Sequence, residues 1–435
     1  MSTGVVLAVG LPASGLGRIG PGERRCFTVS GSPGDAALVN LTPVDAAGNG
    51  NGQLVSSDVI DPPTASNVNY TSGSVDPNVA IAPIGADGQV CYVNSQHTST
   101  HLIADHLGTI SAAAFQRATP GGAPHRALDT RTSGPVEPGE RRCFTVSGSP
   151  GDAAFVNLTP VSAAGNGNGQ LVSSDVIDPP TASNVNYTSG SVDPNVAIAP
   201  IGADGQVCYV NSQHTSTHLI ADHLGTISAA AFQLATQTGA PARAGDTRGG
   251  SPLGPYARQC YVVAGAHGGG AIVNLTPVEA GGGGNGVLVS SSLLAPPAAS
   301  NVNFRPGFVD PNIAVAPLGS DRAVCYVNSR HSAVHVIADH LGTVVGSSFQ
   351  PASIGGAPAR LIDTRGEVPP PAPTTTTVAP RPIGGGTCHS SYPSVCIPPP
   401  PPDLDCGDIT ARNFAVVGAD PHRFDGDNDG IGCET

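Results

Sequence analysis

Short apolar runs separated by polar turns make up most of the first 365 residues. The runs recur about every 8–15 residues, are rich in Val, Ile and Thr, and are divided by Gly, Pro, Asn and Asp. No period of 3.6 persists, so the pattern favours short β-strands over helices. Eight strands are predicted in the first third of the chain: Cys26–Val29, Ala37–Val44, Gln53–Ser56, Asn67–Tyr70, Val79–Ile84, Gln89–Asn94, His101–Ala104 and Thr109–Phe115.

This strand pattern repeats at a period of 117 residues. After an N-terminal segment (1–21), the three copies span 22–131, 139–248 and 256–365. Copies one and two are almost the same text, whereas copy three has diverged much further. In the 95 residues from Gly22 to Gln116, the second copy differs at two positions, with Phe155 for Leu38 and Ser162 for Asp45.

Each copy is much longer than the 20–50-residue solenoid repeats that need neighbours to build a core. We therefore expect each copy to be a self-sufficient domain, so that 256–365 would fold when expressed alone. The predicted fold is mainly β, with three tandem β-sandwich or barrel-like repeats arranged as a rod. The strand topology stays open at this stage.

The composition changes abruptly after the third copy. Residues 366–387 are rich in Pro, Thr and Gly, which is typical of an extended linker. Residues 388–435 hold four cysteines in a segment too short for a core of its own. We expect a proline-rich linker followed by a small disulfide-stapled module.

The overall charge of the chain restricts the kinds of partner that are expected. The formal net charge is −13, and all 19 basic residues are Arg. Nucleic acid is therefore not an expected partner, because binding it needs a cationic surface. No apolar stretch approaches the roughly 20 residues that span a bilayer, so no transmembrane segment is expected. The weak apolar patch from Val5 to Val9 is a poor signal peptide.

Ten regularly placed cysteines predict a secreted or cell-surface protein from an oxidising compartment. The two cysteines of each repeat lie 65 residues apart, and a bridge between them would stabilise by roughly 4 kcal/mol. Four tail cysteines allow three pairings, of which the stiff Pro398–Pro402 run favours the local one. The predicted bridges are Cys26–Cys91, Cys143–Cys208, Cys260–Cys325, Cys388–Cys396 and Cys406–Cys433.

The sharpest chemical motif lies at the C-terminus. Asp425, Asp427 and Asp429 alternate along the chain and are followed by Gly430. Alternate carboxylates in a tight loop supply the oxygen ligands that Ca²⁺ prefers, and the glycine permits the turn. Further predicted ligands are the Ile431 carbonyl and the Glu434 carboxylate. Glu434 falls at position ten of the loop rather than twelve, so this is not an EF-hand.

The segment from about Asp405 to Glu434 resembles the excalibur domain, an extracellular calcium-binding region of bacterial surface proteins. That family has the pattern Asp-x-Asp-x-Asp-Gly-x-x-Cys-Glu, which this chain matches through Cys433 and Glu434. An upstream cysteine preceded by an acid is also expected, and Asp405-Cys406 supplies it. The resemblance covers about thirty of the 435 residues and implies calcium as the cofactor.

The repeats resemble a second, vaguer group, the tandem domains of bacterial cell-surface proteins with Leu-Asp-Thr-Arg boundaries. The matching segments in the first copy are Leu128–Arg131, Val39–Thr42, Ser66–Asn69 and Ile103–Asp105. The similarity covers most of 22–365 but implies no activity. Copy two departs from the boundary pattern, with Gly245 in place of the Leu.

Two further groups of residues, the histidines and the Asp-Thr-Arg triplets, are candidate binding sites that also have a purely structural explanation. Each copy carries three His near one Asp, which for copy one are His97, His101, His106 and Asp105. Zinc is one interpretation, but the period of two places His101 and His106 on opposite strand faces. We therefore expect these His to be hydrogen-bonded to backbone or to the Asp. In Asp129-Thr-Arg131 and its copies, we expect the Arg to pair with a carboxylate and clamp the domain boundary.

The preferred hypothesis is a non-enzymatic surface protein. Its repeats would act in display, and its calcium module would contact the envelope. The main alternative is a lectin-like adhesin whose repeats bind glycans with avidity, and a second is an accessory region of an extracellular hydrolase. An enzyme is disfavoured because no nucleophile and base occur at a recognisable spacing. The envelope polymer or glycan that would be the partner is not specified by the sequence.

Overall fold

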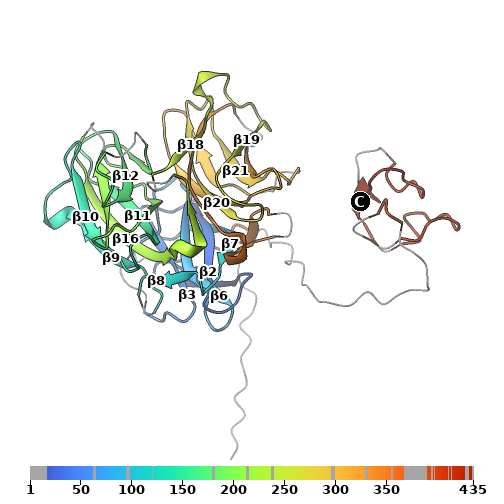
Figure 1. Cartoon of the computed structure of the whole chain (residues 1–435), viewed down its shortest axis with the longest axis horizontal. Helices are drawn as coiled ribbons and strands as arrows, with labels where there is room; N and C mark the ends of the chain where they lie inside the picture. Colours follow the sequence, from blue (N-terminus) through green and yellow to red (C-terminus); the bar gives the residue numbers. More distant parts are fainter. Residues whose placement is uncertain are drawn as a thin grey trace, which may run out of the picture. The chain divides into compact units, whose positions relative to one another are not determined.

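A computed structural model gives the three-dimensional structure of the chain (Figure 1). It describes residues 17–61, 65–94, 98–119, 121–178, 182–211, 215–236, 240–294, 299–328, 332–353, 356–366, 389–392, 395, 397–409, 411–412, 414–426 and 431–433. The chain divides into two compact units, Met1–Ala372 and Pro373–Thr435. In the described part of the chain, no helix is both long and apolar enough to cross a membrane.

Each repeat contributes nine strands to the first unit. Repeat one provides β1 (Arg24–Thr28), β2 (Ala36–Val44), β3 (Gly50–Ser56), β4 (Val68–Tyr70), β5 (Asn78–Pro83), β6 (Gln89–Asn94), β7 (His101–Ile110), β8 (Phe115–Arg117) and β9 (His125–Asp129). Repeat two provides β10 (Arg141–Thr145), β11 (Ala153–Val161), β12 (Gly167–Ser173), β13 (Val185–Tyr187), β14 (Asn195–Pro200), β15 (Gln206–Asn211), β16 (His218–Ile227), β17 (Phe232–Leu234) and β18 (Ala242–Asp246).

Repeat three follows the same order. Its strands are β19 (Arg258–Val262), β20 (Gly270–Val278), β21 (Gly284–Ser290), β22 (Val302–Phe304), β23 (Asn312–Pro317), β24 (Ala323–Asn328), β25 (His335–Val344), β26 (Phe349–Pro351) and β27 (Ala359–Asp363). Four short 3-10 turns are the helical elements of this unit: η1 (Thr130–Thr132), η2 (Ala229–Ala231), η3 (Thr247–Gly249) and η4 (Gly346–Ser348).

These strands form six antiparallel sheets, two for each repeat. The four-stranded sheet of repeat one has the order β1-β6-β3-β4, and the other two repeats have the equivalent sheet. The five-stranded sheets mix two repeats. In the sheet built on β5, β2 and β7, the remaining two strands are β26 and β27 of repeat three.

The same exchange occurs at all three junctions. Strands β8 and β9 of repeat one pair with β16 of repeat two, and β17 and β18 of repeat two pair with β25 of repeat three. Because β26 and β27 return to β7, the exchange closes on itself and the unit is a ring. The last strands of the ring therefore pair with its first repeat across about 250 residues of chain.

The expectation of three tandem sandwich or barrel-like repeats in a rod is wrong. The first unit is all-β, with six sheets arranged as the blades of a β-propeller (Figure 1). A repeat taken alone lacks two strands of its own five-stranded sheet, so the expectation that 256–365 folds independently is not supported by this topology. Strand pattern identifies strands but not their partners, because any strand edge presents the same donors and acceptors.

The individual strands agree well with the pattern, with two differences. The predicted strand His101–Ala104 continues to Ile110 as β7. The predicted strand Thr109–Phe115 is not one strand, because its first two residues belong to β7 and its last residue begins β8. The polar ninth strand, β9, was missed because it has no apolar alternation. Gly108 interrupts β7 with a register shift and a φ of +155°. A Cβ at Gly108 would lie 2.5 Å from the ring of Phe349 in β26, so glycine lets the exchanged strand approach.

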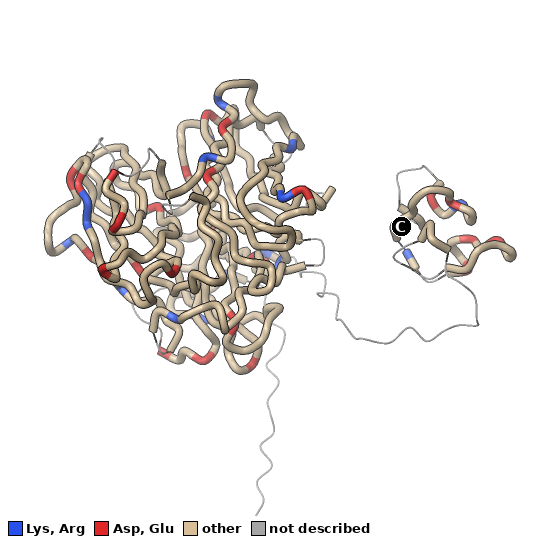
Figure 2. The backbone as a smooth tube through the Cα atoms, in the orientation of Figure 1, with Lys and Arg blue, Asp and Glu red and all other residues tan. Residues whose placement is uncertain are grey.

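Two kinds of apolar core hold the ring. One lies between the two sheets of a repeat and in repeat one includes Phe27, Leu41, Leu54 and Tyr92, all buried. The other is shared by all three repeats and contains Leu38, Phe155 and Ile272 from equivalent positions of β2, β11 and β20. Figure 2 shows the acidic and basic residues scattered along a chain that is mostly neither. The shared core makes the three repeats one cooperative body rather than separate beads.

Four predicted disulfides are present: Cys26–Cys91, Cys143–Cys208, Cys260–Cys325 and Cys406–Cys433. In each repeat the bridge joins residues that face each other directly on the first and sixth strands. The predicted Cys388–Cys396 bridge lies outside the described residues. Disulfides in this number are typical of proteins outside the cytoplasm.

The second unit is small and built around aromatic rings. Its two short strands, β28 (Phe414–Ala415) and β29 (Ile431–Gly432), pair antiparallel. Tyr392 and Phe424 pack at a ring-centroid distance of 5.4 Å, and Phe414 lies 5.5 Å from Phe424. Edge-on contacts of this kind give a short chain more buried area per residue than aliphatic side chains do.

Candidate functional site

The predicted calcium loop is described at its two ends. Asp425 and Ile431 are placed, whereas Asp427, Asp429, Gly430 and Glu434 lie outside the described residues. The Cys433 N–H donates to the Phe424 carbonyl at 2.9 Å, and Ile431 pairs with Ala415 in the two-stranded sheet. These contacts, with the Cys406–Cys433 bridge, bring the ends of the loop together.

Asp420 supports this loop from outside and was not identified from the sequence. Its Oδ2 accepts the Asp425 N–H at 2.8 Å, and its Oδ1 accepts the Tyr392 hydroxyl at 2.6 Å. Burial opposes ionisation of Asp420, but the hydrogen bonds from Tyr392 and from backbone N–H groups lower its pKa. Asp420 therefore stays charged and fixes the first loop residue against the aromatic core.

In the ring, the repeats bring together three copies of an Asp-Pro-Asn turn. Asp76, Asp193 and Asp310 line one small cavity of about 20 Å³. The Asn of each turn is buried and bonds to the next repeat around the ring. These side-chain amide bonds are Asn78 to Asn157 at 2.8 Å, Asn195 to Asn274 at 2.9 Å, and Asn312 to Asn40 at 2.8 Å. The turns therefore link all three junctions while presenting their carboxylates to a common point.

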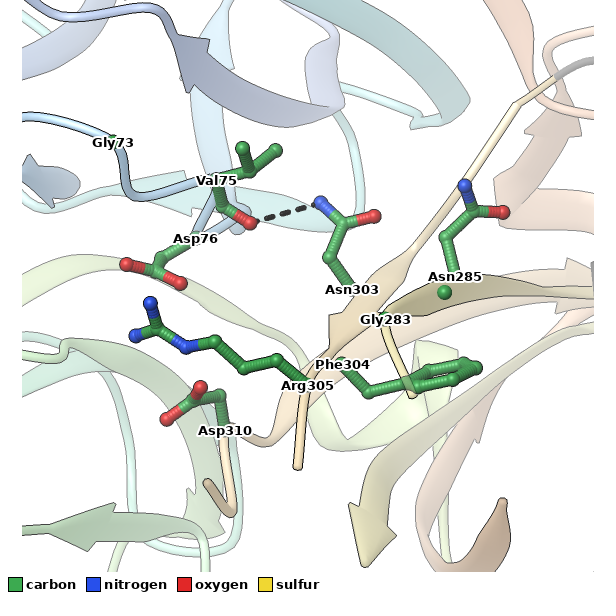
Figure 3. Close-up of a pocket in the computed structure, with 10 residues that line it drawn as sticks. Gly73, Val75, Asp76, Gly283, Asn285, Asn303, Phe304, Arg305 and Asp310 are labelled. Atoms are coloured by element: carbon green, nitrogen blue, oxygen red, sulfur yellow. Dashed lines mark hydrogen bonds between the residues drawn. The ribbon is translucent and has the colours of Figure 1, made fainter. Parts of the chain in front are cut away.

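Only repeat three places a cation beside these carboxylates. Arg305 stands where the other copies have Thr71 and Thr188, and its side chain extends between Asp76 and Asp310 (Figure 3). The guanidinium carbon also lies 3.7 Å from the ring centroid of Phe308. Burial and the neighbouring Asp76 and Asp193 raise the pKa of Asp310 to about 7, and Arg305 offsets part of this. Three carboxylates with one cation cannot all ionise freely near neutral pH.

Two neighbouring cavities open at the junction of repeats three and one. The first, of about 340 Å³, is drawn in Figure 3 and is lined by Asp76, Arg305 and Asp310 among others. The second, of about 570 Å³, is bordered by Asp45 and Tyr256 on its rim. Both are lined by Val75, Asn285 and Asn303. The Asn303 amide donates to the Val75 carbonyl at 3.0 Å, tying repeat three to repeat one at the shared wall.

We call these two cavities the seam groove. A further cavity of about 490 Å³ is lined mainly by residues of repeats one and two, together with Arg305 and Phe308 of repeat three. Its polar lining residues include Asn49, Asn51, Asn69, Ser189 and Asp193. Amide, hydroxyl and carboxylate groups of this kind can accept and donate several directed hydrogen bonds to a polar ligand.

The histidines of the repeats have structural partners. His106, His223 and His340 are buried, and the Nε2 of each lies 3.0 Å from the Oγ1 of Thr109, Thr226 and Thr343 respectively. Burial lowers the pKa of each to about 4. The three imidazoles also have backbone hydrogen bonds, at Gly108, Gly225 and Gly342, and His218 Nδ1 lies 2.9 Å from the Thr130 carbonyl oxygen. The expected backbone partners are therefore confirmed, and threonine hydroxyls are partners that the sequence did not predict. His97 and its copies lie outside the described residues.

The Asp next to each buried His forms an ion pair across a junction. The pairs are Arg360–Asp105 at 2.5 Å, Arg126–Asp222 at 2.5 Å and Arg243–Asp339 at 2.6 Å. Burial raises the pKa of Asp105, and the Arg360 guanidinium offsets part of the increase. Each pair joins an exchanged strand to the repeat that accepts it.

The Asp-Thr-Arg boundaries clamp the junctions, as predicted. The Arg131 side chain pairs with Asp129 of its own triplet at 2.5 Å. The hydroxyl of Thr130 accepts the Leu219 N–H of repeat two at 2.8 Å. Equivalent contacts join Thr247 to Val336 and Thr364 to Leu102, each at 2.9 Å. These contacts hold the ring together.

Comparisons with known proteins add no identification. No family model matches the chain, and no curated protein matches it. Among the described residues, no group of three or more His, Cys, Asp or Glu is arranged to hold a metal ion. The seam groove could not be found from sequence because its walls come from repeats that are distant in the chain. One signal pointed to it, since Arg305 and Phe308 break the pattern of the other two copies.

Proposed function

We propose that this chain is an exported, non-enzymatic binding protein whose ring recognises glycans and whose C-terminal module binds calcium at the cell surface. The observation that carries the proposal is the seam groove, a polar concavity made only when the ring closes. A rod for surface display would need separately folded repeats, whereas these repeats exchange strands and form one ring. Binding a ligand is therefore a better-supported role for the repeats than extending away from the surface.

Groove chemistry favours a neutral, hydroxyl-rich ligand. The shared wall carries the amides of Asn285 and Asn303, and the larger cavity adds Ser300 and Asn328. Two arginines that line the larger cavity already have carboxylate partners, with Arg360 on Asp105 and Arg365 on Asp363, each at 2.5 Å. Paired charges and many amides suit the alternating donors and acceptors of a saccharide better than a strongly charged ligand.

The pseudo-symmetry adds to the proposal. At the junction of repeats one and two, the equivalent residues Val192, Asp193, Asn51 and Asn69 line a related cavity. Several weak sites on one rigid body gain avidity against a polymer that offers repeated units. A cell-envelope polysaccharide or a surface glycan has that form, which agrees with the disulfide-bonded, acidic character of the chain.

In the second unit, calcium would be held by the carboxylates of Asp425, Asp427, Asp429 and Glu434 and the carbonyl of Ile431. Bound there, the ion would neutralise acids that otherwise repel one another. Asp420 would orient Asp425 through the backbone hydrogen bond described above. We propose that this module contacts the envelope while the ring presents its grooves.

A glycan array probed with the full oxidised chain tests the proposal. We expect binding to a limited set of neutral glycans, with affinity increasing when the glycan is presented at high density. The matched control is the full chain with Asn303→Asp, which places a carboxylate on the shared wall and should lose the same hits. Absence of any hit at high density, or hits that Asn303→Asp leaves unchanged, would count against a glycan site in the seam groove.

A further inference from the structure

Tyr256 occupies a backbone position that glycine fills in the other two repeats. Its φ is +62°, and the equivalent Gly22 and Gly139 have φ of +73° and +76°. The turn itself is unchanged, because the N–H of Tyr256 donates to Asn328 at 3.1 Å as Gly22 donates to Asn94 at 3.0 Å. A residue with a side chain is disfavoured in this left-handed conformation, so the backbone of the turn favours glycine over tyrosine.

Neighbouring changes also give up stabilising contacts. In repeat one, Glu23 accepts the Gly20 N–H at 2.7 Å and pairs with Arg25 at 2.6 Å. Repeat three has Ala257 at the position of Glu23, and Gln259 at the position of Arg25. The turn thus lost an ion pair and gained an aromatic side chain that is 56% exposed. Strained and exposed aromatic residues of this kind are typical of binding sites rather than of folding.

The position of Tyr256 accounts for the tyrosine that stands where the other repeats have glycine. It lines the 570 Å³ cavity, which is the larger part of the seam groove, together with Asp45, Asn285 and Asn303. Asp45 is one of the two positions at which repeats one and two differ, since Ser162 replaces it. Repeat three has Glu279 at this position, so it is Tyr256 that distinguishes the junction of repeats three and one from both of the others.

We infer that the rim of the seam groove at Tyr256 is the principal saccharide subsite of the ring, with the tyrosine ring stacking on the apolar face of one sugar. Asn285, Asn303 and Asp45 lie on the same cavity and would bond the hydroxyls around that sugar. A pyranose has one face of C–H groups and a polar edge, which matches an aromatic plane beside amides and a carboxylate. This inference rests on the proposed glycan binding and assigns it to one junction and one side chain.

Three full-chain variants test the subsite against the best glycan from the array, by titration of each purified protein. Tyr256→Gly restores the residue of the other repeats and should weaken binding at least tenfold, with a melting temperature equal to or above that of the wild type. Tyr256→Phe keeps the ring and should bind within about twofold of the wild type. Ile177→Gly removes an apolar side chain that is 86% exposed on repeat two, and should leave binding unchanged.

The outcomes separate this inference from the proposal beneath it. If the wild type binds glycans and Tyr256→Gly binds equally well, the subsite is wrong while glycan recognition stands. Equal losses in Tyr256→Gly and Tyr256→Phe would overturn stacking by the ring. If the wild type binds no glycan, the proposed function and the subsite both fail.

Discussion

The ring and the C-terminal module are stabilised by opposite means. The ring has an apolar core shared by its three repeats, and its five-stranded sheets are completed by strands from another repeat. The module packs aromatic rings of Tyr392, Phe414 and Phe424 within a few tens of residues and is stapled by Cys406–Cys433. Closure of the ring by strands far apart in the chain forms a groove that no single repeat contains. In the module, the disulfide holds a loop whose residues are adjacent in the sequence.

This difference also explains where each unit is vulnerable. Ring closure depends on β26 and β27 pairing with β7 without any direct chain connection to repeat one. At the other two junctions the exchanged strands run directly into the repeat that accepts them. The closing junction should therefore be the place where the ring opens first, while the module depends on its bridge.

The largest effect is expected from the closing ion pair. Asp105→Ala leaves Arg360 without that partner and should lower the free energy of unfolding by about 2–3 kcal/mol. The matched control is Asp222→Ala, which removes the equivalent pair with Arg126 at a covalently continuous junction. Hydrogen exchange should show lost protection at 349–363 in Asp105→Ala, and much less at 115–129 in Asp222→Ala. Equal hydrogen exchange at both junctions would show that the closing junction is as stable as a junction where the chain is continuous.

A smaller effect is expected from the buried histidines of the ring. The folded-state pKa of His223 is about 4, below its usual value near 6.5, so the unfolded chain binds its proton first as pH falls. Its contribution to stability is complete above pH 6.5 and is lost progressively toward pH 4. Between pH 8 and pH 5 the loss should be about 2 kcal/mol.

His223→Gln tests this by thermal melts across the same pH range. The variant should lose about 2 kcal/mol less than the wild type between pH 8 and pH 5. Asp310 acts in the opposite direction, because its pKa of about 7 lets the folded state take up a proton first. Because Asp310 is present in both proteins, its contribution to the pH dependence cancels when the variant is compared with the wild type. An unchanged pH dependence in His223→Gln would mean that the buried histidine is not neutral in the folded ring.

The smallest effect is expected in the module, from calcium. An extracellular site of this kind should have a dissociation constant of about 10⁻⁴–10⁻³ M. At ten times that concentration the ion should stabilise the module by about 1.4 kcal/mol. Asp427→Ala should abolish this gain, whereas Asp403→Ala, an acid outside the loop, should keep it. Calorimetry and thermal melts of the oxidised chain measure both, and no heat from calcium at millimolar concentration would contradict the site.

Sequence by itself determined the local structure of this protein. Apolar alternation predicted the strands, the 117-residue period predicted equivalent units, and constant spacing predicted Cys26–Cys91 and its copies, which are confirmed. These features depend on residues close in the chain or on a fixed repeat. The calcium motif is equally local, and it stays a prediction.

Only the tertiary structure decided which strand completes which sheet. The polar strand β9 carries no apolar alternation, and its partner β16 is identified by a hydrogen-bond ladder and the Arg126–Asp222 pair. Backbone donors and acceptors are the same along every strand edge, so the sequence pattern cannot distinguish a strand that stays in its repeat from one that leaves it. The seam groove follows from that choice, because Tyr256 and Asp45 line one cavity only when β27 closes the ring on β7.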